Sequence, residues 1–158
     1  MERVIQLQGA SINTGNQVLD VLLTGKSVQC VDKHILLTCM ADGSLLRDMD
    51  AMDLCAIFGN ALDNAIEYEE KIQDIQKRLI KLTVRRAGAF RLIRIANYCE
   101  ERLPIGEDLM ETTKADTQQH GYGLKSIRSS AHKYKGKMTL RQEEDWVVLS
   151  VLLPDCAE

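Results

Sequence analysis

The fold of this chain follows mainly from one segment, Asp53-Leu54-Cys55-Ala56-Ile57-Phe58-Gly59-Asn60-Ala61-Leu62-Asp63-Asn64-Ala65-Ile66-Glu67. Its hydrophobic residues recur every three or four positions, which is the period of an amphipathic helix with one buried face. Asp50 is the expected N-cap, and Asp53 falls in the first turn, where negative charge is favoured. The residues expected on the buried face are Leu54, Phe58, Leu62, Ala65 and Ile66.

The other face of this helix is polar and carries two asparagines. Asn60 and Asn64 are one helical turn apart, Glu67 follows, and Asp53 precedes them on the same face. Asparagine is disfavoured inside helices because its amide competes for backbone hydrogen bonds. One interpretation is a solvated polar face, which the spacing alone favours. The other is that the amide oxygens hold a hydrated Mg²⁺ bound to phosphates.

Outward from this helix, the chain alternates between helical and extended patterns. Helices are expected at residues 13–33 and from His120-Gly121-Tyr122-Gly123-Leu124 to about 134, and strands at 34–40, 80–85, 90–95, 137–141 and 146–153. Single helices do not alternate with parallel strands in this order. The prediction is therefore an α/β (α+β) two-layer sandwich, with a mixed, mostly antiparallel sheet and helices on one face.

A polar segment without periodicity covers residues 100–119 and contains Pro104 and Gly106. A loop of about 20 residues is unusual inside a compact domain and is most often a lid or a binding loop. Lys114, which follows Thr112 and Thr113, is a candidate to bind a phosphate oxygen as a point charge. This segment is therefore predicted to be a lid.

Gly121-Tyr122-Gly123 is expected to open the helix that follows the lid. Glycines let the backbone approach an anion closely, and a helix N-terminus offers unpaired N–H groups and partial positive charge. A lone Gly-x-Gly is weak evidence, since glycines of this kind also occur in turns without a ligand. The motif is neither a P-loop nor a dinucleotide-binding fingerprint.

Composition narrows the class of protein. The chain has 158 residues, enough for one domain, and a formal net charge of −3, which argues against nucleic-acid binding. No apolar run approaches the roughly 20 residues of a membrane span, and no signal peptide opens the chain. The cysteines have no Cys-x-x-Cys spacing and are interpreted as buried thiols of a reduced, cytosolic protein: Cys30, Cys39, Cys55, Cys99 and Cys156.

The stretch 53–67 resembles the N-box of the GHKL ATPases, a family that includes gyrase, heat-shock chaperones, histidine kinases and mismatch-repair proteins. His120-Gly121-Tyr122-Gly123-Leu124 resembles their second glycine box. The most similar subgroup is the sensor histidine kinases of the peptide-quorum-sensing receptor type, in which a segment like residues 13–20 precedes the domain. The resemblance implies a Bergerat-type ATP-binding catalytic domain over residues 13–158, with a lid at about 100–120. Residues 1–12 would be the tail of a dimerisation helix or a leader.

The resemblance also implies roles for single residues. Asn64 matches the asparagine that ligates Mg²⁺. Asn60 stands where hydrolytic members carry a glutamate general base, and an amide cannot accept a proton from water, which favours phosphotransfer. Asp63 flanks the site, and Tyr68 matches an aromatic residue near the nucleotide. Further residues expected to bind the nucleotide are Thr113, Lys114, His120, Gly121, Tyr122, Gly123 and Leu124, with Asn60 and Lys114 in catalytic roles.

The first glycine box, Asp-x-Gly-x-Gly, is replaced here by Asn97-Tyr98-Cys99-Glu100. By position, Asn97 takes the place of the aspartate that recognises the adenine amino group. The carbonyl of an asparagine can accept the same hydrogen bond, although it carries no charge. The substitution is interpreted as a divergence of the subgroup.

The implied function is the ATP-binding catalytic domain of a two-component sensor histidine kinase, which transfers the γ-phosphate of ATP to a histidine outside this chain. His34, His120 and His132 lack the helical context of an acceptor. The implied partners are ATP with Mg²⁺, an acceptor histidine on a dimerisation domain and a cognate response regulator, in a membrane-anchored homodimer with this domain in the cytosol. The alternatives are a serine-protein kinase of the anti-sigma-factor type and a degenerate, non-catalytic GHKL interaction module.

Overall fold

The computed structural model describes residues 4–6, 12–103 and 118–155. The described strands form one sheet in the order β1-β2-β3-β4-β6-β5. They are β1 (Val4–Gln6), β2 (Leu36–Ala41), β3 (Leu79–Ala87), β4 (Phe90–Tyr98), β5 (Lys137–Glu143) and β6 (Trp146–Pro154). Strands β2 and β3 are parallel, and every other neighbouring pair is antiparallel. The predicted mixed, mostly antiparallel sheet is confirmed.

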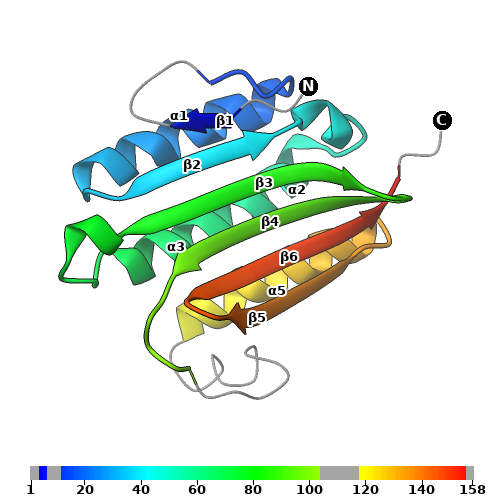
Figure 1. Ribbon diagram of the computed structural model, residues 1–158. Helices are drawn as coiled ribbons and strands as arrows, with labels where there is room; N and C mark the ends of the chain where they lie inside the picture. Colours follow the sequence, from blue (N-terminus) through cyan, green and yellow to red (C-terminus); the bar gives the residue numbers. More distant parts are fainter. Residues whose placement is uncertain (1–3, 7–11, 104–117, 156–158) are drawn as a thin grey trace.

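The helices cover one face of the sheet, so the molecule has two layers (Figure 1). They are α1 (Gln17–Asp32), α2 (Ala51–Leu54), α3 (Asn60–Glu69) and α5 (Gln118–Lys133). Short 3₁₀ turns lie at η1 (Gly43–Leu46) and η3 (Ile75–Lys77). Helix α3 runs between α1 and α5, so the helix with the paired asparagines lies beside the helix that carries the glycines (Figure 1). The predicted two-layer sandwich is confirmed.

The long helix expected from Asp50 is interrupted by a π-helical turn. Asp50 is the N-cap, as predicted, since its carboxylate accepts a hydrogen bond of 2.9 Å from the Asp53 backbone N–H. Helix α2 then passes into the π-turn η2 (Cys55–Gly59), and α3 begins at Asn60. A π-turn inserts one extra residue into a helix and is frequent at functional sites.

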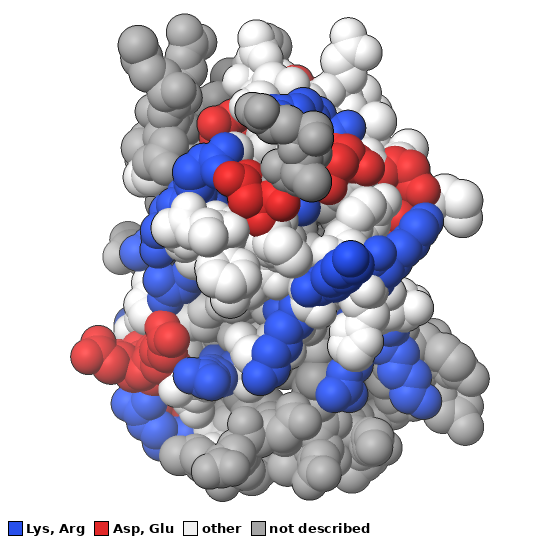
Figure 2. All heavy atoms as spheres, turned by 90° about the vertical axis from the view of Figure 1, so that its right-hand side faces the viewer, with Lys and Arg blue, Asp and Glu red and all other residues white. Residues whose placement is uncertain are grey.

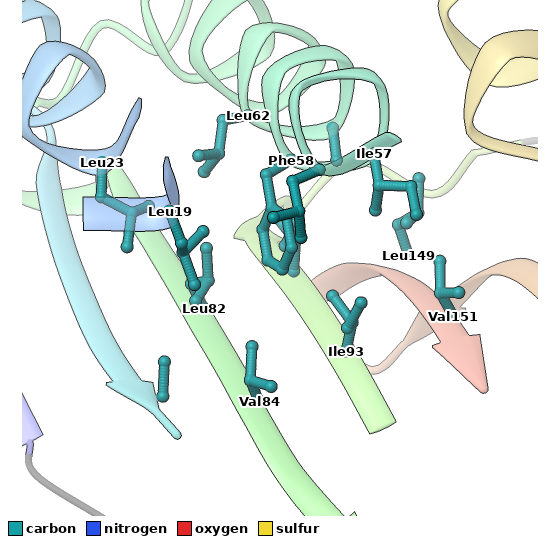
Figure 3. Packing of buried hydrophobic residues seen from close by; sticks show 14 of the residues in the cluster. Leu19, Leu23, Ile57, Phe58, Leu62, Leu82, Val84, Ile93, Leu149 and Val151 are labelled. Atoms are coloured by element: carbon teal, nitrogen blue, oxygen red, sulfur yellow. The ribbon is translucent and has the colours of Figure 1, made fainter. Parts of the chain in front are cut away.

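A single hydrophobic core fills the space between the layers. In Figure 3, Leu19 and Leu23 of α1 and Phe58 and Leu62 of the central helix point toward Leu82 of β3. The predicted buried face is confirmed, because Leu54, Phe58, Leu62, Ala65 and Ile66 are all buried. Each fully buried Leu, Ile or Phe contributes roughly 1.5–3 kcal/mol relative to an exposed side chain. This packing fixes the rotation of α3 and therefore the direction of its polar face.

Residues 1–12 were expected to be the tail of a dimerisation helix or a leader, and within this segment Val4–Gln6 are a strand rather than a helix. These residues form β1 and pair antiparallel with Thr38–Met40 of β2. The β-branched pair Val4-Ile5 favours a strand, and the outer edge of β2 offers unpaired backbone groups. The remaining residues of this segment up to 11 lie outside the described part of the chain.

The cysteines follow the prediction with one exception. Cys30, Cys39 and Cys99 are buried free thiols, whereas Cys55 is exposed because it lies on the outer side of the π-turn. Burial raises the pKa of the Cys30 thiol to about 11. Cys156 lies outside the described residues. Within the described part of the chain, no helix combines the length and the hydropathy needed to cross a membrane.

Charge is mixed on the end of the molecule that carries the β3–β4 turn and the C-terminal end of α5. Figure 2 shows Lys and Arg side chains gathered mainly across the middle and lower half of this face, with acidic groups interspersed. Two ion pairs at this end join Lys133 to Asp50 and Asp53, at 3.0 and 2.8 Å. Tyr134 donates a hydrogen bond of 2.7 Å to the same Asp53 carboxylate. Asp53 therefore connects α2 to the end of α5.

Candidate functional site

The amide of Asn60 is held in one orientation by the π-turn. Its Nδ2 donates a hydrogen bond of 2.7 Å to the carbonyl oxygen of Ala56, one turn back. The backbone N–H of Asn60 bonds instead to the carbonyl of Ile57. The side-chain amide therefore supplies a donor to the irregular turn, and Oδ1 remains as its acceptor end.

This oxygen faces Gly123 of α5. A Cβ atom placed on Gly123 would lie 3.5 Å from Asn60 Oδ1 and 3.6 Å from its Cβ. The N-box and the second glycine motif, far apart in sequence, are therefore in direct contact. The absence of a side chain at Gly123 lets α5 approach the Asn60 side chain closely.

Asn64 follows Asn60 by one turn on the same side of α3. Its side chain is half-buried and makes no hydrogen bond to the residues that the structure describes. A neutral amide oxygen is a suitable ligand for Mg²⁺, which usually takes few protein ligands and keeps water and phosphate oxygens. The described residues include no group of three or more His, Cys, Asp or Glu side chains that could hold a metal alone. Asn64 therefore fits an ion whose remaining ligands come from a nucleotide.

Asp63 lies on another side of α3 than Asn60, so the structure does not bring its carboxylate together with the other predicted site residues. Its carboxylate forms an ion pair with Lys26 of α1. Successive helical residues are rotated by about 100°, so Asn64 can face α5 while its neighbour Asp63 faces α1. Leu124 is only 4% exposed, and its side chain belongs to the hydrophobic core. Its predicted part in nucleotide binding stays a prediction.

The second glycine motif does not open α5. The helix begins at Gln118, so Gly123 lies inside it rather than at its N-terminus. The residues before the motif, Gln118 and Gln119, are good helix formers, and the helix starts there. The backbone N–H of Gly123 is thus inside the helical ladder and is not one of the unpaired N–H groups of the helix N-terminus.

A second cluster lies at the far end of α3, about 13 Å along the helix axis from Asn60 at 1.5 Å per residue. Glu69 is completely buried and accepts two hydrogen bonds, 2.8 Å from the Leu79 N–H and 3.2 Å from Asn97 Nδ2. Burial raises the pKa of the Glu69 carboxyl to about 7, against the opposing effects of these hydrogen bonds and of Arg78. Asn97, near the end of β4, is 8% exposed.

Tyr68 belongs to the same end of α3. Its hydroxyl lies 3.0 Å from the Cys99 sulfur and donates a longer hydrogen bond of 3.4 Å to the Glu101 carboxylate. Burial raises the pKa of the Tyr68 hydroxyl well above its usual value. Tyr68 and Asn97 are thus brought to one end of α3, and Asn60, Asn64 and Gly123 lie toward the other end.

The segment that leaves β4 is attached to the β5–β6 hairpin. Gln142 donates a hydrogen bond of 2.8 Å to the Glu101 carbonyl and accepts one of 3.0 Å from the Leu103 N–H. Arg102 forms an ion pair of 2.9 Å with Asp145. The first residues of the predicted lid are therefore fixed on the sheet. Thr113 and Lys114 lie outside the described residues, and His120, Gly121 and Tyr122 are described only as helical backbone.

Two features of the site were not predicted from the sequence. The π-turn has no clear sequence signal. Glu69 does have one, because it follows Ile66 by three positions on the buried face of the helix. A carboxylate on such a face requires hydrogen-bond partners, and this should have identified Glu69 as part of the site.

A protein-family model described as the GHKL domain matches residues 49–154. The chain belongs to the GHKL family. The match covers the central helix, the hairpin, α5 and both closing strands, which are the elements that build the site. No match is found among curated proteins.

Solved structures share the fold of this GHKL domain at low sequence identity. The catalytic domain of histidine kinase ThkA superimposes with a TM-score of 0.62 at 17% identity, covering 100% of this chain and 99% of that one. Histidine kinase AdeS of Acinetobacter baumannii gives a TM-score of 0.60 at 12% identity, covering 99% of this chain and 68% of that one. This GHKL domain therefore has the fold of histidine kinase catalytic domains.

Proposed function

We propose that this GHKL domain binds ATP with Mg²⁺ and is the catalytic domain of a two-component sensor histidine kinase, transferring the γ-phosphate to a histidine outside this chain. The observation that carries the proposal is the contact between Asn60 and Gly123. It joins the two sequence motifs at one place, with an amide oxygen on one side and a helix position without a side chain on the other.

Asn64 would hold the Mg²⁺, which would neutralise charge on the phosphates. Phosphoryl transfer depends mainly on positioning and charge stabilisation, so the domain needs few reactive groups of its own. Asn60 cannot act as a general base, because an amide does not accept a proton from water. The site is therefore suited to delivering the phosphoryl group to a protein acceptor rather than to water.

The adenine ring of ATP would lie at the other end of α3, where Asn97 and Tyr68 are found. Asn97 would accept a hydrogen bond from the adenine amino group in place of the usual aspartate. Lys114 and Thr113, together with His120, Gly121 and Tyr122, would contact the phosphates from the lid and the start of α5. These assignments rest on the resemblance of the motifs.

The cellular setting belongs to the same proposal. The domain would span residues 13–158 and act in the cytosol, as part of a membrane-anchored homodimer of the peptide-quorum-sensing receptor type. Its partners would be a dimerisation domain with the acceptor histidine and a cognate response regulator. Similarity of fold to ThkA and AdeS supports the kinase assignment.

Calorimetric titration with ATP, in the presence and absence of Mg²⁺, tests the proposal. We expect Mg²⁺-dependent binding, and a loss of affinity of about tenfold or more in Asn64→Ala with little change in melting temperature. Asp63→Ala is the matched control, because its carboxylate pairs with Lys26 on another side of the helix. Absence of binding at millimolar ATP in the folded wild type would instead support a non-catalytic interaction module.

Incubation with radiolabelled ATP tests the transfer step. The isolated chain should not label itself, because the acceptor is expected elsewhere. An acid-labile label on a histidine of a supplied dimerisation domain would support the proposal. An acid-stable label on a serine of a separate protein would favour the anti-sigma-factor type of kinase.

A further inference from the structure

Asn97 can present either of two chemically opposite groups. An asparagine amide has an acceptor oxygen and a donor NH₂ of nearly the same shape. Adenine carries an amino donor at the position where 6-oxopurines, such as guanine and hypoxanthine, carry a carbonyl acceptor. An aspartate would accept from adenine through either oxygen, whereas an asparagine must be held the right way round. Some neighbour therefore has to fix the orientation of Asn97.

Glu69 is that neighbour. One of its oxygens accepts the Leu79 N–H at 2.8 Å, and the other is 3.2 Å from Asn97 Nδ2. An ionised carboxylate only accepts hydrogen bonds, so it requires the NH₂ end of Asn97 to face it. The side-chain oxygen of Asn97 is then directed away from Glu69, and it accepts no hydrogen bond from the described residues.

We propose that Glu69 is a positioning residue that turns the oxygen of Asn97 toward the nucleobase and so makes the site select adenine over 6-oxopurines. The inference rests on the proposed ATP-binding function and adds the group that sets base selectivity. Glu69 does not touch the nucleotide, because it is completely buried beneath Asn97 and the start of β3.

The substitution Glu69→Gln should reverse the orientation of Asn97. The Leu79 N–H is a donor and needs an oxygen in front of it, since an unpaired buried N–H is unfavourable. The oxygen of the introduced glutamine is therefore used there, and its NH₂ faces Asn97. That NH₂ can only donate, so Asn97 turns its own oxygen inward and presents its NH₂ to the base. The variant should then favour a 6-oxopurine.

Calorimetric titration of wild type and Glu69→Gln with MgATP and MgITP measures this reversal. ITP differs from ATP in carrying the 6-oxopurine hypoxanthine. We expect the wild type to prefer ATP and the ratio of the two affinities to shift toward ITP by about tenfold or more in the variant. Adding Asn97→Asp to Glu69→Gln should restore the preference for ATP, because one aspartate oxygen accepts from the glutamine and the other from adenine.

The wild type provides a second readout that needs no variant. Protonated Glu69 can donate to Asn97, so the preference for ATP should weaken from about pH 8 to about pH 6, on either side of the pKa of about 7. The charged and titratable groups that act on Glu69 are Arg78, which precedes β3, and Cys99, which follows β4. The triphosphate is common to both ligands, so its own titration cancels in the ratio.

The outcomes separate the two proposals. An unchanged ATP-to-ITP ratio in folded Glu69→Gln, or an equal loss of both nucleotides that the double variant does not restore, overturns the positioning role. If Glu69→Gln does not fold, a wild type that binds MgITP at pH 8 as tightly as MgATP overturns it. A folded wild type that binds neither nucleotide refutes the proposed function itself.

Discussion

The amide oxygen of Asn60 faces Gly123 across the contact between α3 and α5, and a Cβ on Gly123 would lie 3.5 Å from it. The backbone does not require glycine here, because Gly123 lies inside a helix and does not have a positive φ. Glycine inside a helix is about 1 kcal/mol less favourable than alanine. A residue that weakens its own helix and leaves the Asn60 oxygen uncovered indicates a function in binding.

Gly123→Ala should therefore raise stability and weaken nucleotide binding. The added methyl would make ordinary van der Waals contact with Asn60 and would cover its oxygen. We expect a gain of about 0.5–1 kcal/mol in the free energy of unfolding and a loss of ATP affinity of about tenfold. Gly25→Ala in α1 is the control, since nothing lies within 4 Å of its Cβ position. Its stability should rise without a change in binding, and equal binding by both variants would contradict the role of Gly123.

Asp53 should make the domain less stable in acid. The Lys133 ammonium, followed by hydrogen bonds from Tyr134 and other neighbours, lowers the pKa of Asp53 from 3.8 to about 2. A lowered carboxyl pKa stabilises the fold above the unfolded value, and this contribution is lost as the pH falls through about 2. Asp53→Asn should cost about 1–3 kcal/mol at neutral pH and converge with wild type near pH 2 in denaturant titrations. Asp32→Asn, on the exposed side of α1, is the control.

Glu69 should have the opposite pH dependence. Its pKa is raised from 4.5 to about 7, chiefly by burial. A raised carboxyl pKa gives stability that is fully present below the unfolded value of 4.5 and is lost as the pH rises through about 7. Melting temperatures of the wild type should therefore fall over this interval relative to those of Glu69→Gln, which has no carboxyl to ionise. Parallel curves for the two proteins would show that Glu69 does not titrate in this range.

Gly136 is predicted to be a structural glycine, unlike Gly123. A Cβ there would lie 2.4 Å from a methyl carbon of Leu153 and 2.8 Å from the carbonyl oxygen of Leu152, both in β6. The carbonyl cannot move without disturbing the strand. Gly136→Ala should therefore destabilise the domain by about 1–3 kcal/mol, measured by denaturant unfolding, and leave ATP affinity unchanged in the folded fraction. A neutral effect would show that the connection from α5 to β5 can shift.

The sequence predicted those parts of the molecule that depend on periodicity. The buried face from Leu54 to Ile66 and the antiparallel hairpins follow from patterns with a fixed repeat, and both are confirmed. The direction of each polar residue was harder to predict. Asp63 pairs with Lys26 of α1, whereas Asn60, three residues earlier, faces Gly123 of α5, because packing against two neighbouring helices sets the rotation of α3. Such packing is not encoded in the pattern of one segment.

The roles of Asn60, Asn64, Asn97 and Gly123 in the candidate site stay predictions from the motifs. The motifs gave no indication of the contacts that orient the amides of Asn60 and Asn97. The hydrogen bond from Asn60 to Ala56 depends on the π-turn, and the one from Asn97 depends on a carboxylate 28 positions away in the chain. Long-range partners of this kind are defined only once α3 is packed on the sheet.

The π-turn η2 joins two halves of the central helix that contact opposite ends of α5. The π-turn sets the rotation of α3 about its own axis. One residue more or less between Cys55 and Gly59 would rotate α3 by about 100° relative to Asp53. Hydrophobic matching between α3 and the sheet would then compete with the ion pair to Lys133. Related chains that differ in length at this point should therefore differ in the direction that Asn60 and Asn64 face.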